Sequence, residues 1–144
     1  MKNKILITAS DYYTEITEML VKDAKTVLEK ESINYEIIMV PGVFEIPAAI
    51  KFASKHYIGF VALGCVIRGE TSHYDYVCNE SARGLMDLSL QGIVIGYGIL
   101  TVENINQALE RSKSTKTKSG KGIDATMACI NQLYLKRKYS NAKN

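Results

Sequence analysis

Residues 60–95 read FVALGCVIRGETSHYDYVCNESARGLMDLSLQGIVI, and this stretch decides the fold. It opens with an uninterrupted apolar run at residues 60–66, which is typical of a strand buried on both of its faces. The polar residues 68–73 follow, and after them apolar side chains recur at the three- and four-residue spacing of a helix. Gly92 is expected to end this helix, and another apolar run begins at residues 93–95. A strand, a helix and a second strand in this order predict two parallel strands joined by a right-handed crossover.

The same alternation continues on both sides of this stretch. Apolar runs predict strands at residues 5–9 and 35–40, separated by a helix with one apolar face. A short helix is expected from Pro47, and two more are expected near residues 103–111 and 123–138. The chain is therefore predicted to be an α/β protein with a parallel sheet and helices on both faces.

Length and composition are those of one ordinary domain, so residues 1–144 are expected to form a single domain. Hydrophobic residues make up 47% of the chain and charged residues 23%, which excludes a disordered tail and a disulfide-stapled miniprotein. No apolar run approaches the roughly 18 residues of a membrane span. The apolar stretch at residues 5–9 is too short for a signal peptide. We therefore expect a cytoplasmic protein with no membrane partner.

Positive charge gathers in two segments of the chain. Residues 111–122 contain five basic side chains and no acid, and residues 136–144 contain four more, whereas the rest has nine basic against fifteen acidic residues. A nucleic-acid-binding protein usually spreads its basic residues over one face, so no nucleic-acid partner is expected. The second segment suits the end of a helix, and the first is available to meet an anionic ligand.

Three cysteines, Cys65, Cys78 and Cys129, lie far apart with no CxxC pair. An odd number of cysteines argues against a disulfide framework, and their spacing argues against a zinc site. We expect them to be small buried side chains, with no metal site.

Aromatic and polar residues follow directly after the predicted strands, at residues 10–13, 41–45, 67–73 and 97–98. Ligands of parallel sheets bind beyond the carboxyl ends of the strands. The flat rings can stack on a planar ligand and the polar groups can orient it, so the sequence predicts a small-molecule site at this edge.

Three features of that edge each allow two interpretations. Residues 69–72 precede a helix and either bind a phosphate through backbone N–H groups or are capped by Thr71 or Ser72. His73 is either a proton donor and acceptor or a structural histidine. Glu45 is either a surface charge or an acceptor for ligand hydroxyl groups. No GxxxxGK[ST] or GxGxxG motif is present, so neither a nucleoside triphosphate nor a dinucleotide is indicated.

Two longer motifs resemble the lumazine synthase family. They are PGVFEIP at residues 41–47 and LGCVIRGETSHYDYVCNE at residues 63–80, and the resemblance extends from Lys4 to about Ala128. It implies a three-layer α/β/α sandwich with a four-stranded parallel, flavodoxin-like sheet. It also implies a transferase that condenses 5-amino-6-(D-ribitylamino)uracil with 3,4-dihydroxy-2-butanone 4-phosphate. The products would be 6,7-dimethyl-8-ribityllumazine and phosphate, in the penultimate step of riboflavin biosynthesis, with no cofactor.

The resemblance assigns the ribitylaminouracil to three segments. Tyr12 matches the aromatic residue that stacks on the pyrimidine ring. The segment that grips the ribityl chain comprises Val43, Phe44 and Glu45, with Glu45 accepting hydroxyl hydrogen bonds. The strand end whose backbone reads the pyrimidine edge comprises Cys65, Val66 and Ile67.

The same resemblance implies which residues bind the phosphate and which residue transfers protons. Glu70 and Thr71 match the amides that bind phosphate, and Arg111 matches the arginine that pairs with it. His73 matches the proton donor and acceptor, and Tyr97 matches an aromatic residue lent by a neighbouring subunit. Lys121 is a weaker match to a lysine near the substrate.

Four residues depart from the family pattern without removing a catalytic group. Tyr12 stands where phenylalanine or tryptophan is usual, Tyr13 where asparagine is common, and Tyr97 where phenylalanine is common. Each tyrosine keeps a π-face. Cys65 replaces a small residue, a change that is silent if only its backbone contacts the ligand.

The resemblance implies a homo-oligomer built on pentamers, with active sites between subunits. We expect free pentamers rather than sixty-subunit cages for two reasons. The long amino-terminal arm of cage-forming relatives is missing, and the loop at residues 112–122 carries four lysines whose repulsion would oppose contact between pentamers.

Three other functions stay open at this point. A flavin- or lumazine-binding protein without activity would not need the phosphate arginine. A signalling receiver domain would need an aspartate after its third strand, where this chain has residues 65–67. A related riboflavin synthase on a similar fold would dismutate lumazine instead of forming it.

Overall fold

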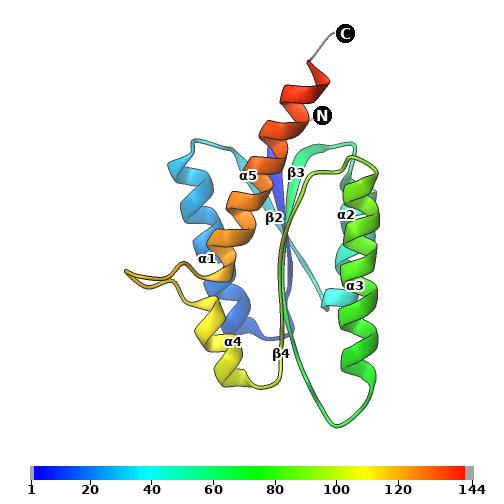
Figure 1. Cartoon of the computed structure of the whole chain (residues 1–144), viewed down its shortest axis with the longest axis vertical. Coiled ribbons are helices and arrows are strands. Elements are labelled where there is room, and N and C mark those ends of the chain that lie inside the picture. The colour runs from blue at the N-terminus through cyan, green and yellow to red at the C-terminus, as the bar shows by residue number, and fades with distance from the viewer. Residues whose placement is uncertain (1, 142–144) are drawn as a thin grey trace.

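The computed structural model describes residues 2–141, which form a four-stranded parallel sheet with helices on both faces (Figure 1). The strands lie in the order β2-β1-β3-β4, and every neighbouring pair is parallel. Their bounds are β1 Lys2–Ser10, β2 Tyr35–Val40, β3 Tyr57–Ile67 and β4 Ile95–Val102. The predicted α/β class and the three-layer, flavodoxin-like sandwich are confirmed.

Five α-helices and one short 3-10 helix cover the described part of the sheet. Their bounds are α1 Thr14–Lys30, η1 Val43–Glu45, α2 Ile46–Ala53, α3 His73–Leu90, α4 Ile105–Ser112 and α5 Lys121–Ser140. Buried residues of α1, α4 and α5 pack on one face of the sheet, and those of η1, α2 and α3 pack on the other. The chain therefore has three layers with β1 and β3 at their centre.

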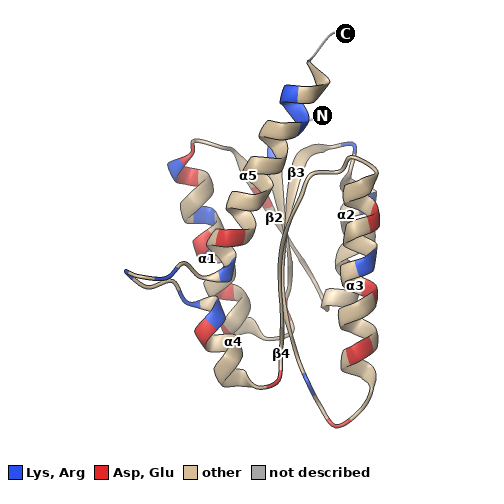
Figure 2. Cartoon of the chain, viewed as in Figure 1, with Lys and Arg blue, Asp and Glu red and all other residues tan. Residues whose placement is uncertain are grey.

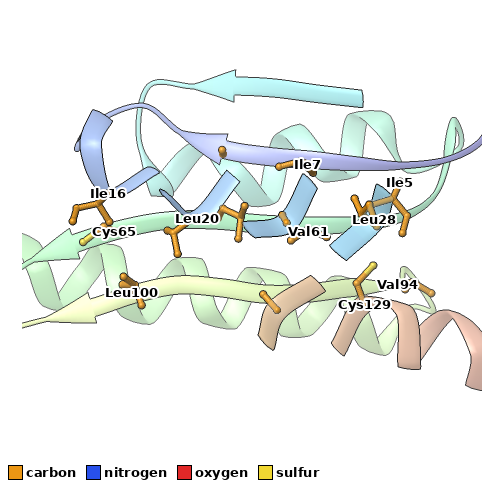
Figure 3. Packing of buried hydrophobic residues seen from close by; sticks show 14 of the residues in the cluster. Ile5, Ile7, Ile16, Leu20, Leu28, Val61, Cys65, Val94, Leu100 and Cys129 are labelled. Carbon is orange, nitrogen blue, oxygen red and sulfur yellow. The ribbon is translucent and has the colours of Figure 1, made fainter. Parts of the chain in front are cut away.

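Strand β3 joins the two cores because its side chains alternate between the faces of the sheet. Val61, Leu63 and Cys65 belong to the cluster under α1, α4 and α5 (Figure 3), whereas Phe60 and Ala62 belong to the cluster under α2 and α3. All five are buried. This double burial explains why residues 60–66 are a continuous apolar run rather than an alternating one.

Several element boundaries differ from the sequence prediction by one to three residues: β1 begins at Lys2 rather than at residue 5, β3 at Tyr57 rather than at residue 60, and α5 at Lys121 rather than at residue 123. Two further differences have a clear local cause. The fourth strand starts at Ile95 rather than at residue 93, because Gly92 has φ 89° and the Ile93 N–H donates to the Leu88 carbonyl, which completes the end of α3. Helix α4 starts at Ile105 rather than at residue 103, because Asn104 caps it.

The Asn104 cap is reciprocal. Its side-chain Oδ1 accepts from the Gln107 backbone N–H at 2.9 Å, and the Gln107 side chain accepts from the Glu103 N–H at 2.8 Å. These two bonds fix the connection from β4 into α4.

The basic segments are exposed and separate (Figure 2). The loop between α4 and α5 projects from the molecule, and the end of α5 extends past the sheet. Residues 142–144 of the terminal basic segment, like Met1, lie outside the described residues. Within residues 2–141, no helix is long and apolar enough to cross a membrane.

Candidate active site

A cleft of about 700 Å³ opens where β1, β2 and β3 end, between these strand ends and the start of α3. Nine of the twelve residues predicted for the site line it: Tyr12, Val43, Phe44, Glu45, Cys65, Val66, Ile67, Thr71 and His73. The sheet edge named by the sequence therefore carries a cavity large enough for a small molecule.

Close packing around Gly64 brings the Val43–Glu45 helix into the cleft. A Cβ atom at Gly64 would lie 2.4 Å from Ser10 Oγ and 2.7 Å from Val43 Cγ2, far inside contact distance. Glycine therefore lets η1 approach the ends of β1 and β3. Val43 is buried by this contact, and Phe44 and Glu45 stay exposed at the cleft.

Two tyrosines form the aromatic wall of the cleft. Tyr12 is 69% exposed, and its ring meets the ring of Tyr13 edge-on, with centroids 5.0 Å apart and planes inclined by 72°. Tyr13 is partly buried, and this burial raises the pKa of its hydroxyl. Tyr13 thus supports Tyr12 from the core side and leaves a π-face open to the cleft.

The end of β3 offers backbone groups to the cleft. Pairing with β1 ends at Leu63, whereas pairing with β4 continues to Ile67. On the side of β1, residues 65–67 therefore have no strand partner among residues 2–141. Amide and carbonyl groups in this position can read the hydrogen-bonding edge of a planar ligand.

Cys65 contributes to the cleft as a neutral thiol. Burial, aided by the neighbouring Cys78, raises the pKa of the Cys65 thiol to about 11. The thiolate is the nucleophilic form of cysteine, so Cys65 is not a nucleophile at neutral pH. Its side chain packs in the core beside Ile16 (Figure 3), which fits a residue that offers its backbone to a ligand.

Backbone N–H groups at the start of α3 face a polar, exposed segment. Ser72 occupies the N-cap position, but within the described chain its side chain makes no capping hydrogen bond. Thr71 Oγ1 accepts from the His73 N–H at 3.4 Å, which is long for a capping bond. The structure therefore gives little support to the interpretation that Thr71 or Ser72 caps the helix. An anion at this helix end would meet N–H donors and the positive end of the helix dipole.

Tyr97 and Arg111 do not line the cleft, and nor does Glu70, although its neighbours Gly69 and Thr71 do. Tyr97 lies on the edge strand β4 and is 37% exposed; burial of the rest raises the pKa of its hydroxyl. Lys121 Nζ lies 6.0 Å from the centre of the Tyr97 ring. Arg111 is exposed on α4, in the layer opposite α3, and its guanidinium donates to the Gln107 carbonyl at 3.3 Å.

Two aromatic residues of the cleft had no role predicted from the sequence. Tyr74 and Tyr76 line the cleft beside His73. Helical spacing was the available signal, because residues 73, 76 and 77 share one face of an α-helix. Placing His73 in the site could thus have predicted Tyr76 as well.

Comparison with known proteins shows the family of the chain. Residues 2–137 match the family model described as 6,7-dimethyl-8-ribityllumazine synthase. The chain is 50% identical over 139 residues to the protein of that name from Zymomonas mobilis, covering 95% of this chain and 99% of the relative. It is 46% identical to the one from Bartonella bacilliformis, covering 95% and 92%. It is 45% identical to the one from Sphingopyxis alaskensis, covering 94% and 96%. Matched over almost its whole length by the family model and by relatives of similar length, the chain belongs to the 6,7-dimethyl-8-ribityllumazine synthase family.

Proposed function

We propose that this cleft condenses 5-amino-6-(D-ribitylamino)uracil with 3,4-dihydroxy-2-butanone 4-phosphate, giving 6,7-dimethyl-8-ribityllumazine and inorganic phosphate. The observation that carries the proposal is the gathering of an aromatic face, a carboxylate, a helix N-terminus and a histidine in one cleft of a chain from this family. The reaction needs no metal or organic cofactor, because amine addition, dehydration and phosphate loss are proton-transfer chemistry.

The ribitylaminouracil has partners that match each of its parts. Its planar ring stacks on Tyr12 and its polar edge meets the free backbone side of residues 65–67. The ribityl hydroxyls lie along η1, where the Glu45 carboxylate accepts hydrogen bonds. This division follows from chemistry, since the ring is flat and the side chain is a polyol.

The butanone phosphate binds at the start of α3. The amides of Glu70 and Thr71 hold its phosphate, with Arg111 supplied by a second subunit. Its ketone then lies toward the ring amine, and holding the two substrates in this geometry can lower the barrier by up to ~7–11 kcal/mol.

His73 moves the protons of the reaction. The amine attacks the ketone and water leaves to form a Schiff base, and phosphate departs as a proton is lost from the neighbouring carbon. The resulting enol becomes a ketone, the second amine adds to it, and a second water leaves as the ring closes. An imidazole beside the phosphate can accept and return these protons, a contribution of roughly 10²–10⁴-fold. Because positioning survives its loss, His73→Ala should lower turnover by about one to three decades.

A homopentamer completes the site. Tyr97, Arg111 and Lys121 are residues of the proposed site that do not line the chain's own cleft, and a neighbouring subunit can present them. Lysines in the exposed loop between α4 and α5 repel one another and favour free pentamers over larger cages. Light scattering should give about 80 kDa for five chains of 16.0 kDa, and a fully active monomer would contradict the proposal. For such a biosynthetic enzyme we propose a cytoplasmic location.

The deciding experiment incubates the protein with both substrates and follows lumazine by its absorbance and phosphate by a coupled assay. Equal amounts of the two products are expected, and His73→Ala serves as the matched control. Ligand binding without turnover would favour a binding protein. Conversion of added lumazine to riboflavin would favour the riboflavin synthase alternative.

A further inference from the structure

Arg68 is the first residue after β3 and directly precedes the proposed phosphate-binding segment, residues 69–72. Its backbone N–H donates to the Val102 carbonyl at 2.9 Å, so its main chain extends the pairing between β3 and β4. The main chain of Arg68 is therefore fixed to the sheet, while the residues that follow it leave the sheet.

The Arg68 side chain contacts two other parts of the chain at once. Its Nε donates to Glu103 Oε2 at 2.9 Å, and one terminal nitrogen donates to Asp75 Oδ1 at 3.3 Å. Its Cζ also lies 4.3 Å from the centre of the Tyr74 ring. A planar guanidinium can bridge two carboxylates and stack on a ring simultaneously, which a lysine ammonium cannot do.

The partners of Arg68 are placed to fix the first turn of α3. Tyr74 and Asp75 directly follow His73, the first residue of that helix. Glu103 is a firm anchor, because its own N–H donates to the Gln107 side chain in the α4 cap. Arg68 thus ties the start of α3 to the connection between β4 and α4.

The segment between these tied points has few contacts of its own. Residues 68–73 are all exposed, and a Cβ atom at Gly69 would have no neighbour within 4 Å in the described chain. Without a tie, the amides of residues 70–71 and the His73 ring would sample many arrangements, and ordering them would reduce the gain from binding.

We propose that Arg68 is a positioning residue for the reaction: it closes the 69–72 segment and holds the first turn of α3, so that the phosphate-binding amides and His73 keep a fixed spacing. The inference rests on the proposed function. It concerns a residue that does not line the cleft.

A second arginine provides a matched control. Arg83 also bridges two carboxylates, Glu80 and Asp87, but all three residues lie within α3 and none lines the cleft. The Arg68 side chain is 40% exposed and that of Arg83 is 64% exposed, so neither set of ion pairs is expected to contribute much to stability. The two arginines therefore differ in what they tie rather than in how much they stabilise.

The experiment compares Arg68→Ala, Arg68→Lys and Arg83→Ala with the wild-type protein. Arg68→Ala should lower kcat and raise KM for the butanone phosphate, with kcat/KM falling about 10- to 100-fold, because misplacement of reacting groups has effects of this size. KM for the ribitylaminouracil and the unfolding midpoint should stay close to those of Arg83→Ala. Arg68→Lys should recover part of the activity. Hydrogen exchange of residues 69–75 should accelerate in Arg68→Ala and stay unchanged in Arg83→Ala.

Four results would overturn the inference. Kinetics and hydrogen exchange of Arg68→Ala that match those of Arg83→Ala would show that the tie has no role. Weaker binding of both substrates with a large drop in unfolding temperature would show a general structural role. Recovery of activity in Arg68→Ala/Asp75→Asn would show that Arg68 only neutralises a charge near the phosphate. An inactive wild-type protein would refute the proposed function, whereas unchanged hydrogen exchange would refute the tie itself.

Discussion

Two variants, His73→Ala and Arg111→Ala, each remove one side of the proposed site, and mixing them should restore activity. His73 lies in the cleft at the start of α3, whereas Arg111 lies on α4 in the opposite layer of the sandwich. If one phosphate contacts both residues, they come from different subunits. A mixed oligomer can then contain intact sites although neither variant has any.

The expected recovery follows from counting subunit pairs. In an equal mixture with random assembly, about one quarter of the interfaces combine an intact His73 cleft with an intact Arg111, and about one quarter lack both. Each variant alone should keep about 0.1–10% of wild-type activity at low substrate concentration, since one proton-transfer group or one phosphate pair is lost. The mixture should therefore reach about 25% of wild type, well above the mean of its parents.

The assay unfolds and refolds the variants together, so that subunits exchange, and then measures lumazine formation below KM. The control mixes His73→Ala with Glu45→Gln, which both alter the cleft of the same chain. No interface in that mixture is intact, so its activity should equal the mean of the parents. The same outcome for the first mixture, with exchange verified by mass spectrometry, would refute a site shared between subunits.

Three other predictions address single residues. Arg111→Ala should weaken the butanone phosphate by about one to two decades and leave ribitylaminouracil binding unchanged in steady-state kinetics, with Arg111→Lys intermediate; equal weakening of both substrates would make the arginine structural. Gly64→Ala should lower the free energy of unfolding by about 1–3 kcal/mol through overpacking, whereas Gly69→Ala, in open space, should change it little in urea titrations. Burial raises the pKa of Cys65 to about 11 and of Cys129 to about 12, so the folded state keeps its thiols protonated while the unfolded state ionises near pH 9. Stability should therefore be unaffected by these groups below pH 9 and should fall from pH 9 to 12, less steeply in Cys129→Ala; a midpoint that rises with pH would contradict this.

The sequence predicted the order and type of the elements because hydrophobic periodicity records burial directly. It misplaced several boundaries, and at two of them, the starts of β4 and α4, short-range hydrogen bonds set the position. Val94 is buried and reads as strand, yet residues 93–94 belong to the connection between α3 and β4. Glu103 suits a helix in composition, but the Asn104 cap excludes it. Hydrophobicity cannot distinguish these cases, since capping depends on backbone geometry.

The cleft was predictable because residues after parallel strands meet at one sheet edge. Its shape was less predictable, because it depends on contacts between distant residues. Gly64 appears in sequence as one glycine within a strand, and only its distances to Ser10 and Val43 explain how η1 reaches the cleft. The hydrogen bond from Arg68 to Glu103 likewise joins residues 35 positions apart and carries no periodic signal.

Under the proposed function, one substrate would depend on the fold of a single chain and the other on the assembly of subunits. Every group assigned to the ribitylaminouracil lies at the end of β3, on η1 or in the connection that follows β1, so the fold of one chain suffices to bring these groups together. Under the proposed function, the phosphate instead needs the start of α3 together with an arginine from α4, and one chain holds these in opposite layers. Under the proposed function, a separated subunit would keep affinity for the ribitylaminouracil but lose it for the butanone phosphate. Assembly would then increase the affinity for the butanone phosphate and the rate of catalysis, because the oligomer supplies the charge that the phosphate requires.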